Sequence, residues 1–192
     1  AYVGASLGLR TPCFTRSRWD WTEAASYALL GRIPARRLTG NMSGEAVEIG
    51  QRQLTLASFF DLDGFAHRGY AAGWSEDRSV ILWEQGRVLF TLMAWFLESE
   101  DERLLHYVRG LLQALGRASR LEEGRRLFDS RFTAVDHPFT DVSPMILVEP
   151  LMKYYELTDD ADALALCEGI VNWAVDGDTH FVDEQYRFSG WL

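Results

Sequence analysis

Leu92-Met93-Ala94-Trp95-Phe96 and, 59 residues later, Leu151-Met152-Lys153-Tyr154-Tyr155 are two copies of the stretch that decides the fold. An acidic pair follows each copy at the same distance, Glu100-Asp101 in the first and Asp159-Asp160 in the second. A glycine embedded in apolar residues then follows each pair, and the offset does not change. Repetition at a fixed period indicates one supersecondary unit that is used more than once and packs against its own copies.

Each copy has the pattern of two helices joined by the acidic turn. The first helix, expected over residues 83–98 and again over 141–157, is apolar nearly all round, as an inner helix buried on both sides should be. The second, over 101–118 and again over 160–175, has an apolar stripe opposite charged residues and is typical of an outer helix. The turns supply the residues that cap the outer helices.

A weaker copy precedes these two, with an inner helix expected over residues 21–30 and an outer helix over 43–59. Pro34 and the Gly40-Asn41 pair should interrupt the chain between them. The sequence therefore predicts an all-α fold, an α/α toroid in one domain over residues 1–192, with three helical hairpins at roughly 20–59, 83–118 and 141–175.

The segments that return from an outer helix to the next inner helix are long and aromatic. They cover residues 59–83, 127–139 and 181–191, and turns or short hairpins are expected within them at 61–65 and 181–188. All of these segments would lie on one rim of the toroid. Long loops gathered on one rim are usually where function resides.

Composition excludes several classes of partner. The formal net charge of -9, from 28 acidic against 19 basic side chains, would repel a phosphate backbone, so no nucleic-acid partner is expected. Cys13 and Cys167 form neither a disulfide framework nor a zinc-binding spacing, which favours a reducing compartment and a cytoplasmic location. The longest apolar run, residues 88–97, is too short to span a membrane.

An acid recurs at or near the start of each predicted inner helix, next to aromatic residues. The three sites are Trp19-Asp20-Trp21, Trp83-Glu84-Gln85 and Phe139-Thr140-Asp141. If the inner helices run parallel, the three carboxylates face one cleft. Aromatic rings stack on sugars while paired carboxylates serve as acid and as base or nucleophile, so Asp20, Glu84 and Asp141 are the predicted catalytic residues. Helix capping, which favours acids in any first turn, is the competing explanation.

Glu84 is the best candidate for the general acid, because it lies between Trp83 and a deeply apolar helix and burial favours the protonated carboxyl. Arg87, one turn further along, would either clamp a sugar carboxylate or pair with Glu84. No metal or cofactor is expected, since the histidines are isolated in the sequence. The predicted substrate-binding residues are Trp19, Trp21, His67, Trp83, Gln85, Arg87 and His137.

These motifs together resemble the toroid domain of six-hairpin glycosidases, nearest to the β-L-arabinofuranosidase-like members. The resemblance is carried by Trp19-Asp20-Trp21, Trp83-Glu84-Gln85-Gly86-Arg87, His137-Pro138-Phe139 and residues 154–160. It implies a glycoside hydrolase that acts on oligosaccharides or polysaccharides, built from about six hairpins and often followed by β-sandwich domains. The cysteine and zinc chemistry of the arabinofuranosidase branch has no counterpart here, so that mechanism is not carried over.

Two other functions are alternatives for the same pattern of residues. A helical-repeat module could bind a glycan or a protein on its aromatic rim without turnover. Isoprenoid cyclisation is disfavoured, because the acidic stretch at residues 159–162 falls at the start of an outer helix, where a cap explains it. Three hairpins form only an arc whose inner helices are too apolar for a free edge, so a C-terminal half or a second copy is expected to complete the ring.

Overall fold

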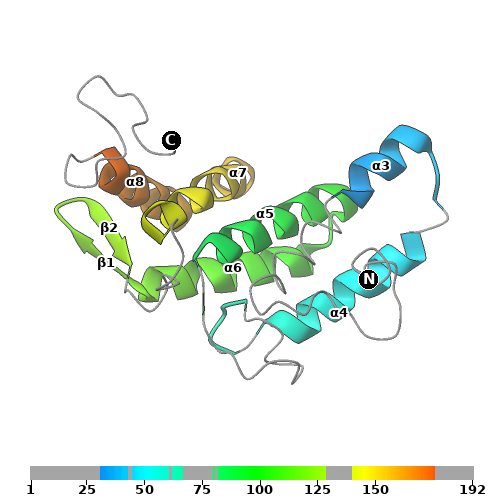
Figure 1. Ribbon diagram of the computed structural model, residues 1–192, viewed down its shortest axis with the longest axis horizontal. Helices are drawn as coiled ribbons and strands as arrows, with labels where there is room; N and C mark the ends of the chain where they lie inside the picture. The colour runs from blue at the N-terminus through cyan, green and yellow to red at the C-terminus, as the bar shows by residue number, and fades with distance from the viewer. Residues whose placement is uncertain are drawn as a thin grey trace.

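The computed structural model describes residues 31–42, 45–60, 62–66, 80, 82–128 and 140–175. The predicted inner helix over residues 21–30 lies outside this part. Most of the described residues are helical, and the remainder includes a small two-stranded sheet, in agreement with a helical fold class (Figure 1). The elements are α3 (Arg32–Thr39), α4 (Glu45–Phe59), α5 (Leu82–Ser99), α6 (Glu102–Arg117), β1 (Ser119–Glu122), β2 (Arg125–Phe128), the 3₁₀ helix η2 (Thr140–Leu147), α7 (Val148–Thr158) and α8 (Ala161–Val175).

Two helical hairpins, α5 with α6 and α7 with α8, make up the centre of the molecule. The inner helices α5 and α7 pack against each other and run in the same general direction, as predicted (Figure 1). The bounds of α5, α6 and α8 agree with the predicted helices to within one residue. The hydrophobic core lies between the helices of the two hairpins, and its largest fully buried side chains include Trp95, Tyr154, Leu89, Leu92, Met93, Leu104, Leu111 and Leu115.

The two inner helices end in the same way. Ser99 and Thr158 each donate their hydroxyl to the carbonyl four residues earlier, at 2.7 and 2.8 Å. The residues that follow, Glu100 and Asp159, adopt the left-handed conformation with φ of 52° and 53°. The backbone N–H of each donates to a carbonyl of the last helical turn, at 2.7 and 2.8 Å, which ends the helix as a left-handed C-terminal cap does.

The outer helices also begin in the same way. Asp101 Oδ1 accepts the backbone N–H of Arg103 at 3.1 Å, and Asp160 Oδ1 accepts that of Asp162 at 3.0 Å. Both bonds satisfy an N–H that has no acceptor inside the helix. The predicted capping role of the acidic turns is confirmed, and it accounts for the cluster of aspartates at the start of α8.

The predicted inner helix over residues 141–157 is wrong in its first half. The chain forms the 3₁₀ helix η2 up to Leu147, and the α-helix begins only at Val148. Pro144 and Pro150 are the physical reason, because proline donates no backbone hydrogen bond and its ring clashes with the carbonyl four residues earlier. Each interrupts an α-helical ladder through this segment.

Residues 119–128 form a β-hairpin between the predicted outer helix, which ends at residue 118, and the predicted return segment over 127–139. β1 and β2 pair antiparallel, with Ser119 opposite Phe128 and Glu122 opposite Arg125. The two residues between the strands, Glu123 and Gly124, have φ of 50° and 80°. Two positive φ values in a two-residue loop are what a tight hairpin turn requires. The almost wholly helical prediction therefore missed one small sheet.

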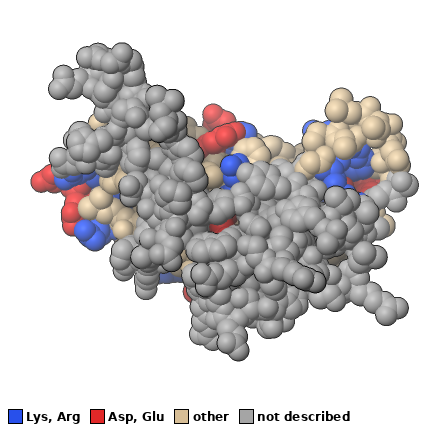
Figure 2. Space-filling view, viewed as in Figure 1, with Lys and Arg blue, Asp and Glu red and all other residues tan. Residues whose placement is uncertain are grey.

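Helix α3 corrects the prediction that Pro34 breaks the chain. Pro34 is the third residue of α3, in the first turn, where a backbone N–H has no intrahelical acceptor. Its missing N–H therefore costs no hydrogen bond, and the helix continues to Thr39. The break at Gly40 is confirmed, since this residue has φ of 66° and caps the helix. Figure 2 shows the arginines of α3 close to an acidic side chain.

The ends of α3, α4 and α5 are joined by ion pairs. Arg36 of α3 contacts Glu48 of α4 at 3.4 Å and Glu98 of α5 at 2.8 Å, and all three side chains are largely buried. Arg37 also pairs with Glu98. These contacts fix α3 and the first turn of α4 at the C-terminal end of α5.

Each outer helix carries a tight turn from the segment that precedes its hairpin. The turn at residues 62–66 packs on α6, because Gly64 approaches the backbone of Gly110 so closely that a Cβ would lie 2.7 Å from its carbonyl oxygen. Arg117 Nη2 donates to the Asp63 carbonyl at 2.8 Å. A turn or short hairpin was predicted here, and the bridge between Phe60 and Ala66 confirms it.

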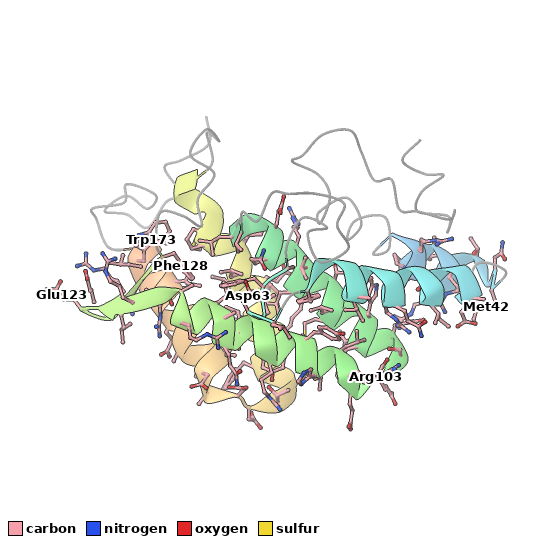
Figure 3. The ribbon with its side chains drawn as sticks, turned by 90° about the horizontal axis from the view of Figure 1, so that it is seen from below. Met42, Asp63, Arg103, Glu123, Phe128 and Trp173 are labelled. Atoms are coloured by element: carbon pink, nitrogen blue, oxygen red, sulfur yellow. The ribbon has the colours of Figure 1, made fainter. Side chains whose placement is uncertain are left out.

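The β1–β2 hairpin occupies the corresponding place on α8 (Figure 3). A Cβ on Gly169 would lie 2.8 Å from Arg126 Cβ, and Asn172 Nδ2 donates to the Gly124 carbonyl at 3.0 Å. A turn thus packs closely on each outer helix, although the glycine that allows the approach lies in the turn at α6 (Gly64) and in the helix at α8 (Gly169). The repeating unit is therefore a turn followed by two helices.

Candidate functional site

Glu84 is a buried carboxylate in the first turn of α5. Only 1% of its surface is exposed, although acids are seldom buried to this extent in proteins. The first turn of a helix presents N–H groups without intrahelical acceptors and the positive end of the helix dipole, which favour the carboxylate, whereas burial disfavours its charge. The predicted burial of Glu84 is thus present in the structure.

Gln85, the next residue, is fully buried and holds a backbone segment from elsewhere in the chain. Its Oε1 accepts the N–H of Ala66 at 2.9 Å, and its Nε2 donates to the carbonyl of Ala66 at 2.8 Å. The side-chain amide therefore pairs with Ala66 as a neighbouring strand would. Gln85 was predicted to bind substrate, but these contacts give it a positioning role, because they fix residues 62–66 at the start of α5.

Gly86 brings the start of α5 into direct contact with η2. A Cβ at this position would lie 2.5 Å from Ile146 Cγ2 and 2.9 Å from the Ile146 carbonyl oxygen. That carbonyl cannot accept a bond from the residue four positions later, because this residue is Pro150. Gly86 follows Glu84 by two residues, and η2 is the element that carries Asp141. The first turn of α5 is therefore in contact with the end of η2, and the prediction that Glu84 and Asp141 face one cleft stays a prediction.

A polar cluster lies on the seam between α5 and α7. Lys153 Nζ of α7 is 4.6 Å from the centroid of the Phe90 ring on α5 and 2.8 Å from Glu149 Oε1. A cation over an aromatic face is an attractive arrangement. Arg87 lies one helical turn before Phe90 and is half-buried. This seam presents an aromatic face, two cations and a carboxylate.

Phe90, Glu149 and Lys153 were not among the predicted site residues. One signal was available, because Lys153 replaces the Ala94 of the first copy inside an otherwise apolar helix. A charged residue at an apolar position of a repeat marks a surface that differs between the copies. The distance between Phe90 and Lys153 along the chain concealed their contact.

Several predicted residues lie outside what the structure describes. Asp20, Trp19, Trp21, His67 and His137 belong to this group. For Trp83 and Asp141 the backbone is placed at the starts of α5 and η2, and their side chains are not described. Of the predicted site, the structure therefore positions the side chains of Glu84, Gln85 and Arg87.

Among residues 31–42, 45–60, 62–66, 80, 82–128 and 140–175, no three His, Cys, Asp or Glu side chains are grouped so that they could hold a metal ion. Within the same part of the chain, no helix combines the length and apolar character that crossing a membrane would require. Cys167 of α8 is buried against the Val148 carbonyl, with the Sγ at 3.8 Å. Burial, assisted by Glu168, raises the pKa of this thiol and disfavours the reactive thiolate.

Comparison of the chain with protein-family models, with curated proteins and with solved structures gives no match. The function must therefore be argued from the residues at the start of α5 and from the arrangement of the hairpins.

Proposed function

We propose that this chain is part of an α/α toroid and acts as a glycoside hydrolase on oligosaccharides or polysaccharides. In this proposal Glu84 is the general acid, and Asp20 and Asp141 supply the base or nucleophile. The observation that carries the proposal is the carboxylate of Glu84, which is only 1% exposed although it lies at the start of an inner helix. The next two residues, Gln85 and Gly86, contact Ala66 and Ile146.

The arrangement of the helices supports the toroid. Two consecutive hairpins place α5 and α7 side by side in the same direction, each joined to its outer helix by the same turn. Further hairpins added with this geometry would extend the arc towards a ring. A C-terminal half of the toroid or a second copy would complete it, and the starts of all inner helices would then converge on one rim.

The burial and packing of Glu84 support the role of a general acid, because burial disfavours the charged form of a carboxyl group. General acid catalysis requires a carboxyl held in one place and shielded from water. Gln85 and Gly86 meet this need through their contacts with Ala66 and Ile146, which fix the first turn of α5. Trp19, Trp21, His67, Trp83, Arg87 and His137 would bind the sugar rings around it.

The test is hydrolysis of a panel of pyranosides and furanosides by the chain and by a Glu84→Gln variant. Removal of a general acid lowers the rate by about 10²–10⁴-fold. The loss should be much larger for a methyl glycoside, whose leaving group needs a proton, than for a p-nitrophenyl glycoside, whose leaving group departs as an anion. Equal losses on both substrates would contradict the acid role.

Glu48→Gln is the matched control. Glu48 is also a buried carboxylate, 8% exposed, but it pairs with Arg36 at the opposite end of α5. This variant should leave kcat/KM unchanged even if it unfolds more easily. Binding of glycans without turnover of any glycoside would contradict the hydrolase and support the alternative, a non-catalytic helical-repeat module.

A further inference from the structure

A pocket of about 390 Å³ lies between the two outer helices, away from the residues proposed for hydrolysis. It is bounded by the C-terminal half of α6, by β2 and by the first turns of α8. Leu112 and Leu166, both buried, form an apolar floor. Gln113, Arg117, Arg126 and Asp162 contribute the polar groups of its wall. An apolar floor with a few convergent polar groups is typical of small-molecule sites.

The backbone of Arg126 and the aliphatic part of its side chain fix this residue at the pocket. It lies on β2, where it pairs with Leu121, and its Cβ packs against Gly169 of α8. Its Nε is shielded from solvent and has no hydrogen-bond partner, and the side chain forms no ion pair within the described part of the chain. A shielded N–H without an acceptor is energetically unfavourable. A ligand that enters the pocket and accepts this hydrogen bond would therefore bind more tightly.

Arg117, at the C-terminal end of α6, supplies a second cation to the lining of the pocket. Its Nη2 donates to the Asp63 carbonyl at 2.8 Å, which anchors one end of the planar guanidinium. A guanidinium has five N–H donors in a fixed fork, so an anchored arginine still presents donors to a ligand. Asp162, in the first turn of α8, places one carboxylate against these two cations, and the wall keeps a net positive charge.

We propose that this pocket binds a small organic anion, with its carboxylate or phosphate group between Arg117 and Arg126 and its apolar part on Leu112 and Leu166. Arginine forks match the geometry of both anions. Asp162 opposes the charge of the ligand and keeps the affinity for multiply charged ions low. The site is separate from Glu84 and does not depend on hydrolase activity.

The experiment follows the Arg126 Nε–Hε resonance of the ¹⁵N-labelled chain by NMR. Acetate and inorganic phosphate are added separately at constant ionic strength, and chloride serves as the reference. We expect a saturable shift of this resonance with acetate or phosphate and none with chloride, and the relative affinities identify the preferred anion. A shift of the same size with chloride would overturn the proposal.

Four variants sharpen the result. Arg126→Gln should weaken binding at least about tenfold, as expected for loss of a charge-assisted hydrogen bond. In that variant, backbone amide resonances around the pocket serve as the probe. Arg120→Gln is the control, because Arg120 lies on β1, pairs with Glu122 at 2.6 Å and does not line the pocket. Equal weakening by both variants would show charge screening alone and overturn the site.

The remaining two variants act in opposite directions. Asp162→Asn removes the opposing carboxylate and should tighten binding several-fold, whereas Ala165→Met fills the pocket without changing any charge and should abolish binding. Circular dichroism of each variant establishes that it is folded. A folded Ala165→Met variant that binds like the unaltered chain would also overturn the proposal.

Discussion

The two hairpins are alike at one end and different at the other. At the turn between inner and outer helix, α5/α6 and α7/α8 share their hydroxyl bonds, their left-handed residue and their aspartate cap. At the opposite end, α5 is a regular helix from Leu82, whereas the second copy begins as a 3₁₀ helix with Pro144. The turn that sets the geometry of the hairpin is kept, and the end at which the first helix of each hairpin starts has diverged.

The two divergent starts fit each other. Pro150 leaves the Ile146 carbonyl without its α-helical donor, and Gly86 allows the backbone of α5 to approach this carbonyl. The difference between the copies is therefore part of the packing, and it places the first turn of α5, which carries Glu84, against the end of η2.

Gln85→Leu should cause the largest loss of stability among these variants, because it removes a contact that has no counterpart in the second copy. The leucine is similar in size, but the buried N–H and carbonyl of Ala66 lose both partners. Each unsatisfied group costs about 1–3 kcal/mol, so we expect a loss of about 3 kcal/mol in the free energy of unfolding. Urea denaturation measures it. Gln53→Leu, at an exposed position of α4, is the control and should change stability by less than about 0.5 kcal/mol.

Gly86→Ala tests the contact between the copies directly. The new Cβ would overlap Ile146, and overpacking of this kind costs about 1–3 kcal/mol. Gly50→Ala, in α4 with nothing within 4 Å of the added Cβ, is the matched control. It should stabilise the chain by up to about 1 kcal/mol through helix propensity. Destabilisation of both variants alike in thermal unfolding would show that the approach to Ile146 is not tight.

The end that the copies share was predictable from sequence, because its signals are local. Residues 99–101 and 158–160 each combine a hydroxyl, an acidic residue and an aspartate that caps the next helix, and such a triplet needs no distant partner. The amphipathic stripe of α6 was equally visible. Pro34 misled the prediction for α3, since a proline in the first turn starts a helix as readily as it ends one.

The divergent end was less predictable, because its contacts join distant parts of the chain. Apolar neighbours pointed to the burial of Glu84, but nothing near Gln85 indicates Ala66 as its partner. The β-hairpin escaped because strands β1 and β2 are rich in charged residues and lack the alternation that marks a strand. Only the Glu123-Gly124 pair marked its turn.

Asp101→Ala and Asp160→Ala test the shared end. Each removes the cap of an outer helix, which costs about 1 kcal/mol. Both caps make the same backbone hydrogen bond, and the side-chain bonds that differ, from Arg103 to Asp101 and from Tyr154 to Asp160, are exposed or long. The two losses should therefore agree to within about 0.5 kcal/mol in urea denaturation. Glu102→Ala, one residue beyond the first cap, is the control and should have little effect. Loss at only one of the two positions would show that the turns are not equivalent.

The smallest expected effect is a pH dependence of stability that arises at the first turn only. Arg103 donates from Nε and Nη2 to the Asp101 carboxylate at 2.9 and 2.8 Å, and this side-chain hydrogen bonding lowers the pKa of Asp101 below its usual value of 3.8. The second copy has Asp162 where the first has Arg103.

A carboxyl group whose pKa is lower in the folded state than in the unfolded state contributes stability that is fully present above the unfolded pKa. This contribution is lost as the pH falls through the folded pKa. Arg103→Met should therefore lower the urea midpoint slightly at pH 7 and progressively less below pH 4, where Asp101 takes up its proton. Arg109→Met, an exposed change on the same helix, should show no such trend. A difference between Arg103→Met and the unaltered chain that stays constant down to pH 2 would mean that Arg103 acts through helix packing and not through the charge of Asp101.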